Sequence, residues 1–177
     1  RLSTIFYMGI YADTGGFVYS NTHPTTFEIL SKITKFDIKP DEIVQNYFTN
    51  IKPQALEMLR RALNSVKFYE DGQIVVSALR FNDFDETKIS YGDSKMIVDY
   101  TQRIDGVKVA ISIFEPEKGD YHVSLRTASP DVDVSLIAKK FNGGGHVRAS
   151  GMKLVGEYDK ALRALINQAK SVLGLKK

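Results

Sequence analysis

The clearest structural signal in the chain lies in Val107-Lys-Val-Ala-Ile-Ser-Ile113 and, eight residues on, in Tyr121-His-Val-Ser-Leu-Arg126. In both segments apolar residues alternate with polar or small ones, which is the period of a strand with one face in a core. The residues between them, 115–120, predict a turn, so the two segments are expected to be neighbouring strands. Side chains two residues apart share one face of a strand. The second segment therefore places three side chains on one polar face: His122, Ser124 and Arg126.

The sequence on either side of these strands predicts helices and a hairpin. Pro53 opens a helix with one expected buried stripe, in which the apolar residues recur at helical spacing: Leu56, Leu59, Leu63 and Val66. Residues 66–79 predict a hairpin that turns at Gly72. Further elements are expected as helices at 24–35, 41–49, 83–103 (with Met96 and Ile97), 134–141 and 158–173, and a strand at 152–155. The fold class is α/β, in the α+β sense: a helical front segment and a small mixed sheet flanked by helices.

Composition narrows the classes of protein to consider. The 177 residues include no cysteine, which excludes disulfides, zinc-thiolate sites and a cysteine nucleophile and fits a reducing, cytoplasmic location. No apolar run is long enough to span a membrane, and no signal peptide opens the chain. Residues 101–177 carry 13 basic and 8 acidic groups, a balance that suits an anionic ligand but equally suits a solvated surface.

A run of three glycines, Gly143, Gly144 and Gly145, follows one of the predicted helices and precedes His146. It predicts a loop whose backbone N–H groups are free to converge on an anion, with an imidazole beside them. The alternative is a glycine hinge or a helix C-cap. The spacing matches neither the dinucleotide-binding fingerprint nor the P-loop.

Arg126 and Asp13 are two further candidates. A guanidinium in the middle of a strand needs a partner, and either a phosphate or a local carboxylate, Asp131 or Asp133, would serve. Asp13 follows an apolar segment and precedes Gly15 and Gly16, so it is expected on a loop after a buried element. There it would bind Mg²⁺ or Mn²⁺, or stabilise its own turn.

Two segments carry a family resemblance. Phe141-Asn-Gly-Gly-Gly-His-Val-Arg-Ala-Ser-Gly151 resembles the glycine-histidine motif of the DHH-associated C-terminal domain, and the strands and the helix before it occur in the matching order over about 50 residues. Met8-Gly-Ile-Tyr-Ala-Asp-Thr-Gly-Gly-Phe17 resembles the last metal-binding motif of the DHH catalytic domain. The chain is therefore similar to the C-terminal part of a DHH-family, RecJ-like phosphoesterase.

The resemblance implies an organisation and a set of roles. Residues 1–50 would be the end of a DHH catalytic domain, residues 51–66 a linking helix, and residues 67–177 the DHH-associated substrate-binding domain. Asp13 would be a manganese ligand. The substrate-binding residues would be Ser124, Arg126, Asn142, Gly143, Gly144, Gly145 and His146.

The family's first motif, a histidine with two spaced aspartates, and its Asp-His-His triplet do not occur in the chain. Ser150 stands where the family's glycine-histidine motif has alanine. The resemblance thus implies a Mn²⁺-dependent phosphoesterase of the short-RNA branch, acting on short oligonucleotides (nanoRNA) and on 3′-phosphoadenosine 5′-phosphate. This chain would supply substrate binding, be inactive alone and hold no manganese alone. Its expected partners are oligonucleotides or nucleotides, a missing N-terminal catalytic domain and, as one option, a second copy in a homodimer.

Three alternatives stay open. A cyclic-dinucleotide phosphodiesterase would have the same two domains. A non-catalytic nucleic-acid-binding module is the second, because a similar domain is appended to alanyl-tRNA synthetases. The third is a structural domain with a fortuitous glycine run, against which stands the order of two motifs in one chain.

Overall fold

A computed structural model describes residues 2–19, 21–94 and 98–175 of the chain. Two compact units are present, Arg1–Ile51 and Lys52–Lys177. Residues 52–66 of the expected linking helix thus belong by their contacts to the second unit, and the assignment of domain identities stays a prediction. Among the described residues, no helix is both long enough and apolar enough to cross a membrane.

The first unit is helical, as expected. It contains α1 (Leu2–Asp13), α2 (Pro24–Ile33), α3 (Pro40–Val44) and the π-helix η1 (Gln45–Thr49). Among its described residues, the buried apolar ones are few: Tyr7, Leu30 and Ile43. Contrary to the expectation of a buried front element, α1 leaves three large apolar side chains more than half exposed: Leu2, Ile5 and Phe6. The unit therefore has more apolar surface than its own core can bury.

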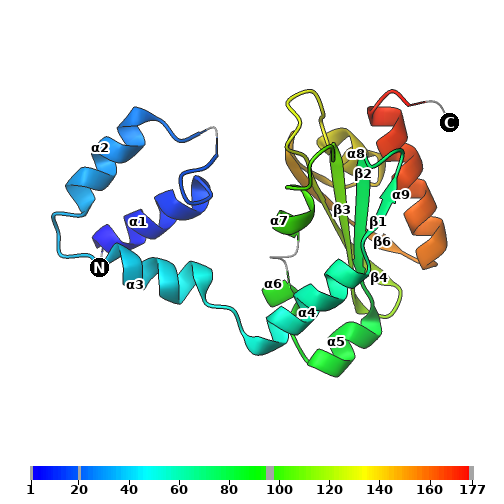
Figure 1. Cartoon of the computed structure of the whole chain (residues 1–177), viewed down its shortest axis with the longest axis horizontal. Coiled ribbons are helices and arrows are strands. Elements are labelled where there is room, and N and C mark those ends of the chain that lie inside the picture. The colour runs from blue at the N-terminus through cyan, green and yellow to red at the C-terminus, as the bar shows by residue number, and fades with distance from the viewer. Residues whose placement is uncertain (1, 20, 95–97, 176–177) are drawn as a thin grey trace. The chain divides into compact units, whose positions relative to one another are not determined.

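The second unit is built on a six-stranded mixed sheet (Figure 1). Its strands are β1 (Lys67–Tyr69), β2 (Ile74–Leu79), β3 (Val109–Glu117), β4 (Asp120–Arg126), β5 (Gly144–His146) and β6 (Ala149–Val155), in the spatial order β1-β2-β3-β4-β6-β5. Among these described strands, only the β2–β3 pair is parallel. The described part of the connection between those two strands carries the short helices α5 (Phe81–Thr87), α6 (Tyr91–Ser94) and α7 (Val98–Thr101). The predicted mixed sheet flanked by helices is confirmed.

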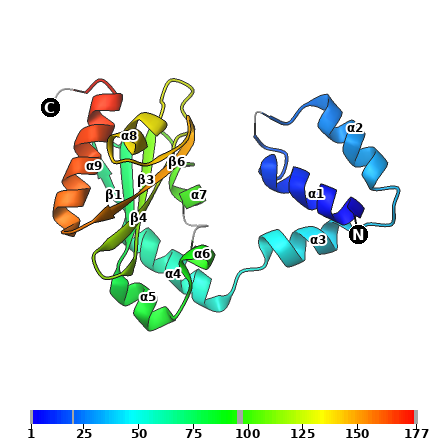
Figure 2. The ribbon, with the colours of Figure 1, turned by 180° about the vertical axis from the view of Figure 1, so that it is seen from behind.

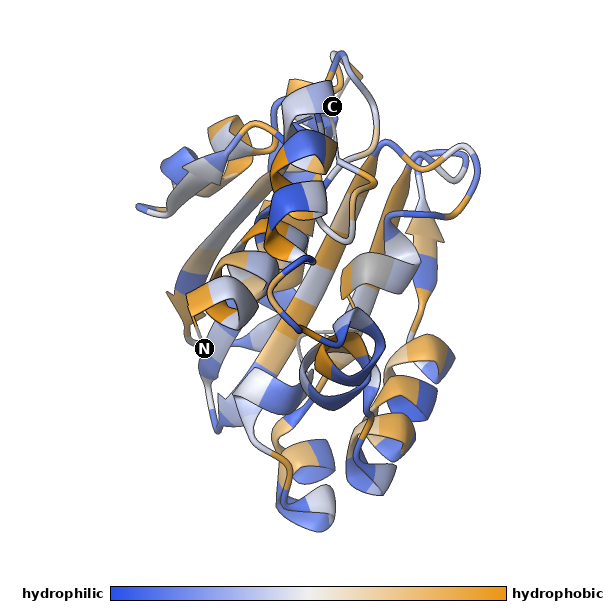
Figure 3. Cartoon of the chain, turned by 90° about the vertical axis from the view of Figure 1, so that its left-hand side faces the viewer, coloured by the Kyte–Doolittle hydropathy of each residue, from blue (hydrophilic) through white to orange (hydrophobic). Residues whose placement is uncertain are grey.

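Helices cover both faces of this sheet. On one side, here called the α9 face, α8 (Ser135–Lys140) and α9 (Tyr158–Val172) bury the main core with Ile111, Val123 and Leu125 (Figure 2). On the other, the α4 face, α4 (Pro53–Asn64) and α5 pack against Leu79 and Phe114. The long helices show alternating hydrophobic and hydrophilic bands, as expected for helices that bury one side (Figure 3).

Two predictions about helices are wrong in detail. In α4 the buried stripe consists of Ala55, Met58, Leu59 and Ala62, whereas Leu56 and Leu63 are 59% and 47% exposed. Both sets have helical spacing, and the smaller side chains let the helix approach the sheet closely. The single helix expected at 83–103 is instead α5, α6 and α7. Met96 and Ile97, which the prediction used, lie outside the described residues.

Candidate functional site

The side chains of strand β4 alternate between the two faces of the sheet, as the sequence predicts. Tyr121, Val123 and Leu125 are buried in the core of the α9 face. The residues between them are partly buried and point to the α4 face: His122, Ser124 and Arg126. The polar row therefore lies on the sheet surface that α9 does not cover.

Strand register brings His146 onto the same face as Arg126. Arg126 pairs with Ala149 across the β4–β6 ladder, and Ala149 pairs with His146 across the β6–β5 ladder. Directly opposite residues of antiparallel strands point to the same face. Because neighbouring strands lie about 5 Å apart, the Cα atoms of Arg126 and His146 are separated by about 10 Å.

A second row of small residues lies beside the first. Ser124 pairs with Gly151, and Gly151 pairs with Gly144. Together with Ala149 these two glycines leave a strip of sheet with almost no side chains, here called the glycine patch (Gly144, Ala149 and Gly151). The patch is flanked by a hydroxyl, a guanidinium and an imidazole.

The glycine run is not the free loop that the sequence predicts, because Gly144 and Gly145 belong to edge strand β5. A Cβ at Gly143 would overlap the backbone of Gly151 and Met152. A Cβ at Gly145, where φ is +139°, would lie 2.6 Å from the carbonyl oxygen of Ala149. A Cβ at Gly144 would meet nothing within 4 Å. Close packing thus requires glycine at 143 and 145, and the space over Gly144 is open.

Asn142 forms the transition from α8 to β5. It adopts a left-handed conformation with φ of +57°, and the N–H of Gly143 donates to the carbonyl of Ala138 at 2.9 Å. This is the geometry of a helix C-terminus that ends on a left-handed residue. Asn142 and Gly143 thereby reverse the chain and align β5 with β6, while contact of either residue with substrate stays a prediction.

The β5–β6 hairpin is fixed from three sides. The hydroxyl of Ser150 donates to the carbonyl of His146 at 2.7 Å. The turn residues also accept from the rest of the unit: the carbonyl of Val147 from the N–H of Val134 at 2.9 Å, and that of Arg148 from the N–H of Thr127 at 3.2 Å. The serine at position 150 therefore anchors the backbone of His146.

Arg126 does not form the carboxylate pairs considered from sequence. One of its terminal nitrogens, Nη1, donates to the carbonyl of Leu125 at 2.9 Å. Asp133 instead accepts from the backbone N–H of Ser135 at 2.8 Å. None of the ion pairs among residues 2–19, 21–94 and 98–175 includes Arg126.

Tyr91 of α6 is a member of this site that sequence reasoning missed. Its ring centroid lies 4.4 Å from that of His122 and 5.4 Å from that of Phe114. Burial raises the pKa of Tyr91, while the nearby hydroxyl of Ser124 and the charge of Arg126 lower this pKa in part. Tyr91 comes from a short helix without periodic signal, so no sequence pattern pointed to it.

Asp13 lies at the end of α1, where a loop was expected. The side-chain amide of Asn21 donates to its Oδ2 and to its backbone carbonyl, both at 3.0 Å. Within the described parts of the chain, no group of three His, Cys, Asp or Glu side chains could hold a metal ion. Since Mn²⁺ and Mg²⁺ need several oxygen or nitrogen ligands, the residues described here do not fit a manganese site by themselves.

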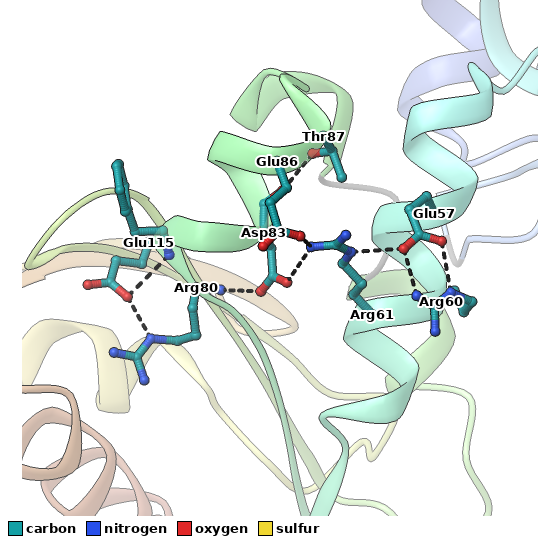
Figure 4. Close-up of polar contacts among 9 residues, drawn as sticks. Glu57, Arg60, Arg61, Arg80, Asp83, Glu86, Thr87 and Glu115 are labelled. Atoms are coloured by element: carbon teal, nitrogen blue, oxygen red, sulfur yellow. Dashed lines mark hydrogen bonds and ion pairs between the residues drawn. The ribbon is translucent and has the colours of Figure 1, made fainter.

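A separate cavity of about 560 Å³ lies at the β1 edge of the sheet. Its cationic lining residues are Arg60, Arg61, Lys67 and Arg80. Arg61 is hydrogen-bonded to Glu57, Asp83 and Glu86 at 2.7–3.1 Å (Figure 4). Hydrogen bonds from Arg60, the larger cause, and from Arg61 lower the pKa of Glu57 to about 2.

Arg80 is likewise paired. Its Nε donates to Glu115 at 2.6 Å, and its guanidinium lies 4.0 Å from the ring centroid of Tyr158. Glu115 is buried, and it also accepts from the N–H groups of Gly119 and Phe81. The guanidinium charges of this cavity are thus balanced by carboxylates that connect α4, α5 and β3.

Comparisons with known proteins cover most of the chain. A family model described as the DHHA1 domain matches residues 71–174. The bifunctional oligoribonuclease and PAP phosphatase NrnA of Thermus thermophilus is 27% identical over 170 residues, which are 93% of this chain and 50% of that protein. The A-adding tRNA nucleotidyltransferase of Aquifex aeolicus is 26% identical over 168 residues, 94% of this chain and 20% of that protein.

A solved structure supports the fold. The exopolyphosphatase-related protein of Bacteroides fragilis has a TM-score of 0.87 at 24% identity, over 96% of this chain and 49% of that one. The chain spans about half the length, or less, of the proteins that it matches.

Proposed function

Because the chain belongs to the DHHA1 domain family, we propose that it forms the substrate-binding part of a phosphoesterase that acts on short oligonucleotides or on 3′-phosphoadenosine 5′-phosphate. The name of the Thermus thermophilus relative supports both substrates. The domain division given above, with the end of a catalytic domain in residues 1–50, belongs to the same proposal.

The observation that carries this proposal is the strand register that places Arg126, Ser124 and His146 around the glycine patch. A guanidinium, a hydroxyl and an imidazole are the groups that bind phosphate oxygens. The absence of side chains on Gly144 and Gly151 lets a phosphate approach the backbone closely. These residues would bind the substrate phosphate, neutralise its charge and fix its orientation.

The metal-binding part of such an enzyme requires residues beyond those described here. Asp13 is one carboxylate, and we propose that it completes a manganese site whose other ligands lie in the part of the relatives that this chain does not match. A metal ion supplies an activated water in this reaction class. The exposed Leu2, Ile5 and Phe6 on α1 support a further packing partner for the first unit.

Binding of a 5′-phosphorylated dinucleotide to the chain, measured by isothermal titration calorimetry, tests the proposal. We expect Arg126→Ala and His146→Ala each to weaken binding about tenfold, because each removes a charge-assisted or polar bond to phosphate. Arg163→Ala is the matched control, since Arg163 is exposed on α9, on the opposite face of the sheet. Unchanged affinity in both site variants would refute the site.

A second candidate is a nucleic-acid-binding module without hydrolytic function, because the Aquifex aeolicus relative is named for a different activity, nucleotide addition to tRNA. A manganese-dependent hydrolysis assay separates the two. We expect no turnover by this chain alone and turnover by a longer protein that contains it. Binding without turnover in the longer protein would favour the module, and robust turnover by the chain alone would overturn the assignment of roles.

A further inference from the structure

Tyr91 is held in a fixed orientation at the border of the glycine patch. Its ring lies against His122, with 4.4 Å between centroids and 57° between planes, and meets Phe114 at 5.4 Å and 69°. His122 and Phe114 are directly opposite each other in the β3–β4 ladder. The Tyr91 ring thus packs on the side chains of Phe114 and His122, which are paired on adjacent strands of the sheet.

The hydroxyl end of Tyr91 reaches the next row of the sheet. The Ser124 hydroxyl is close enough to lower the pKa of the Tyr91 hydroxyl, and Ser124 is the direct register partner of Gly151. The side chain of Ser124 therefore lies between the Tyr91 ring and the glycine patch. Tyr91 is only partly buried, so the residue keeps some contact with solvent beside the patch.

We propose that Tyr91 is the residue of this site that contacts a nucleobase: the base adjoining the phosphate on the glycine patch stacks on its ring. This inference rests on the proposed function. It adds a contact for the nucleobase, the part of the ligand that the phosphate-binding groups do not recognise. Every nucleobase has a π-face, so stacking on an aromatic ring favours any base over none. A ring already fixed by His122 and Phe114 loses little conformational freedom on binding.

The test compares two ligands that share a phosphate and a ribose but differ in the base, adenosine 5′-monophosphate and ribose 5-phosphate. For the wild-type chain we expect the nucleotide to bind about tenfold more tightly, within the range of one base-aromatic stack. Tyr91→Leu should remove this preference and leave the affinity for ribose 5-phosphate unchanged within about twofold. Tyr91→Phe, which keeps the ring and loses the hydroxyl, should retain most of the preference.

Proton NMR of the wild-type chain gives a second reading that needs no variant. We expect adenosine 5′-monophosphate, and not ribose 5-phosphate, to shift the ring signals of Tyr91. An equal loss of affinity for both ligands in Tyr91→Leu, or a persisting preference, would overturn the inference while the proposed function stands. A wild-type chain that binds neither ligand would overturn both.

Discussion

At the scale of single residues, the neighbouring glycines Gly144 and Gly145 are expected to differ in what they contribute to stability. Gly145→Ala should lower the free energy of unfolding by about 2 kcal/mol, because φ is +139° there and a Cβ would lie 2.6 Å from the Ala149 carbonyl oxygen. Gly144→Ala should leave stability within about 0.5 kcal/mol, since its Cβ would meet nothing within 4 Å. Urea unfolding of both variants measures this, and equal destabilisation would contradict it.

The residues of the site were predictable to different degrees. Strand alternation gave the shared face of Ser124 and Arg126, and the register that adds His146 follows from the β5–β6 hairpin. The hairpin itself was not predicted, because a glycine run has no side-chain periodicity from which to infer a strand. Tyr91 was also missed, since its place depends on how a short helix packs on the sheet.

At the scale of elements, the Arg80–Glu115 pair joins the start of α5 to β3. Burial raises the pKa of Glu115, but hydrogen bonds from Arg80 and from the Gly119 N–H outweigh it, so its pKa lies below the ordinary value. A depressed carboxyl pKa stabilises the fold above the unfolded-state pKa of about 4.3, and this stabilisation is lost as pH falls through the folded-state pKa.

Glu115→Gln should therefore lower the free energy of unfolding by about 2 kcal/mol at pH 7, the worth of hydrogen bonds to a charged group. The difference from the wild type should narrow as pH falls below about 4.3 and through the lowered pKa of the folded state, where the wild-type carboxylate is protonated. Urea unfolding at several pH values measures this. A difference that is constant with pH would contradict the role given to the charge.

In α4, the sequence pattern predicts the helix correctly but not which of its sides is buried. Its existence follows from Pro53 and the apolar spacing, but the spacing allows two overlapping stripes. The sheet selects Met58 and Ala62 because the small side chain permits a close approach. Leu56 and Leu63, the larger residues, remain exposed. Tertiary packing thus decides which stripe is buried, and the helix propensities of the residues carry no information about that packing.

At the scale of the whole molecule, the first unit exposes large apolar side chains to solvent. Phe6 is 60% exposed, so Phe6→Ser should leave the melting temperature of this chain nearly unchanged. In a longer protein that contains the proposed catalytic part, the same substitution should lower the melting temperature by several degrees, because the side chain would then be buried. Val155→Ser, at a position 81% exposed in the second unit, is the control and should be neutral in both lengths.

The most direct test of the glycine patch is an NMR titration of the chain with a 5′-phosphorylated dinucleotide, followed at the backbone amides. Binding at the patch predicts the largest shifts at Ser124, Gly144, Gly151 and their neighbours in β4, β5 and β6, which the register places side by side. Shifts centred instead on the cavity lined by Arg60, Arg61, Lys67 and Arg80, with the patch unchanged, would contradict the account.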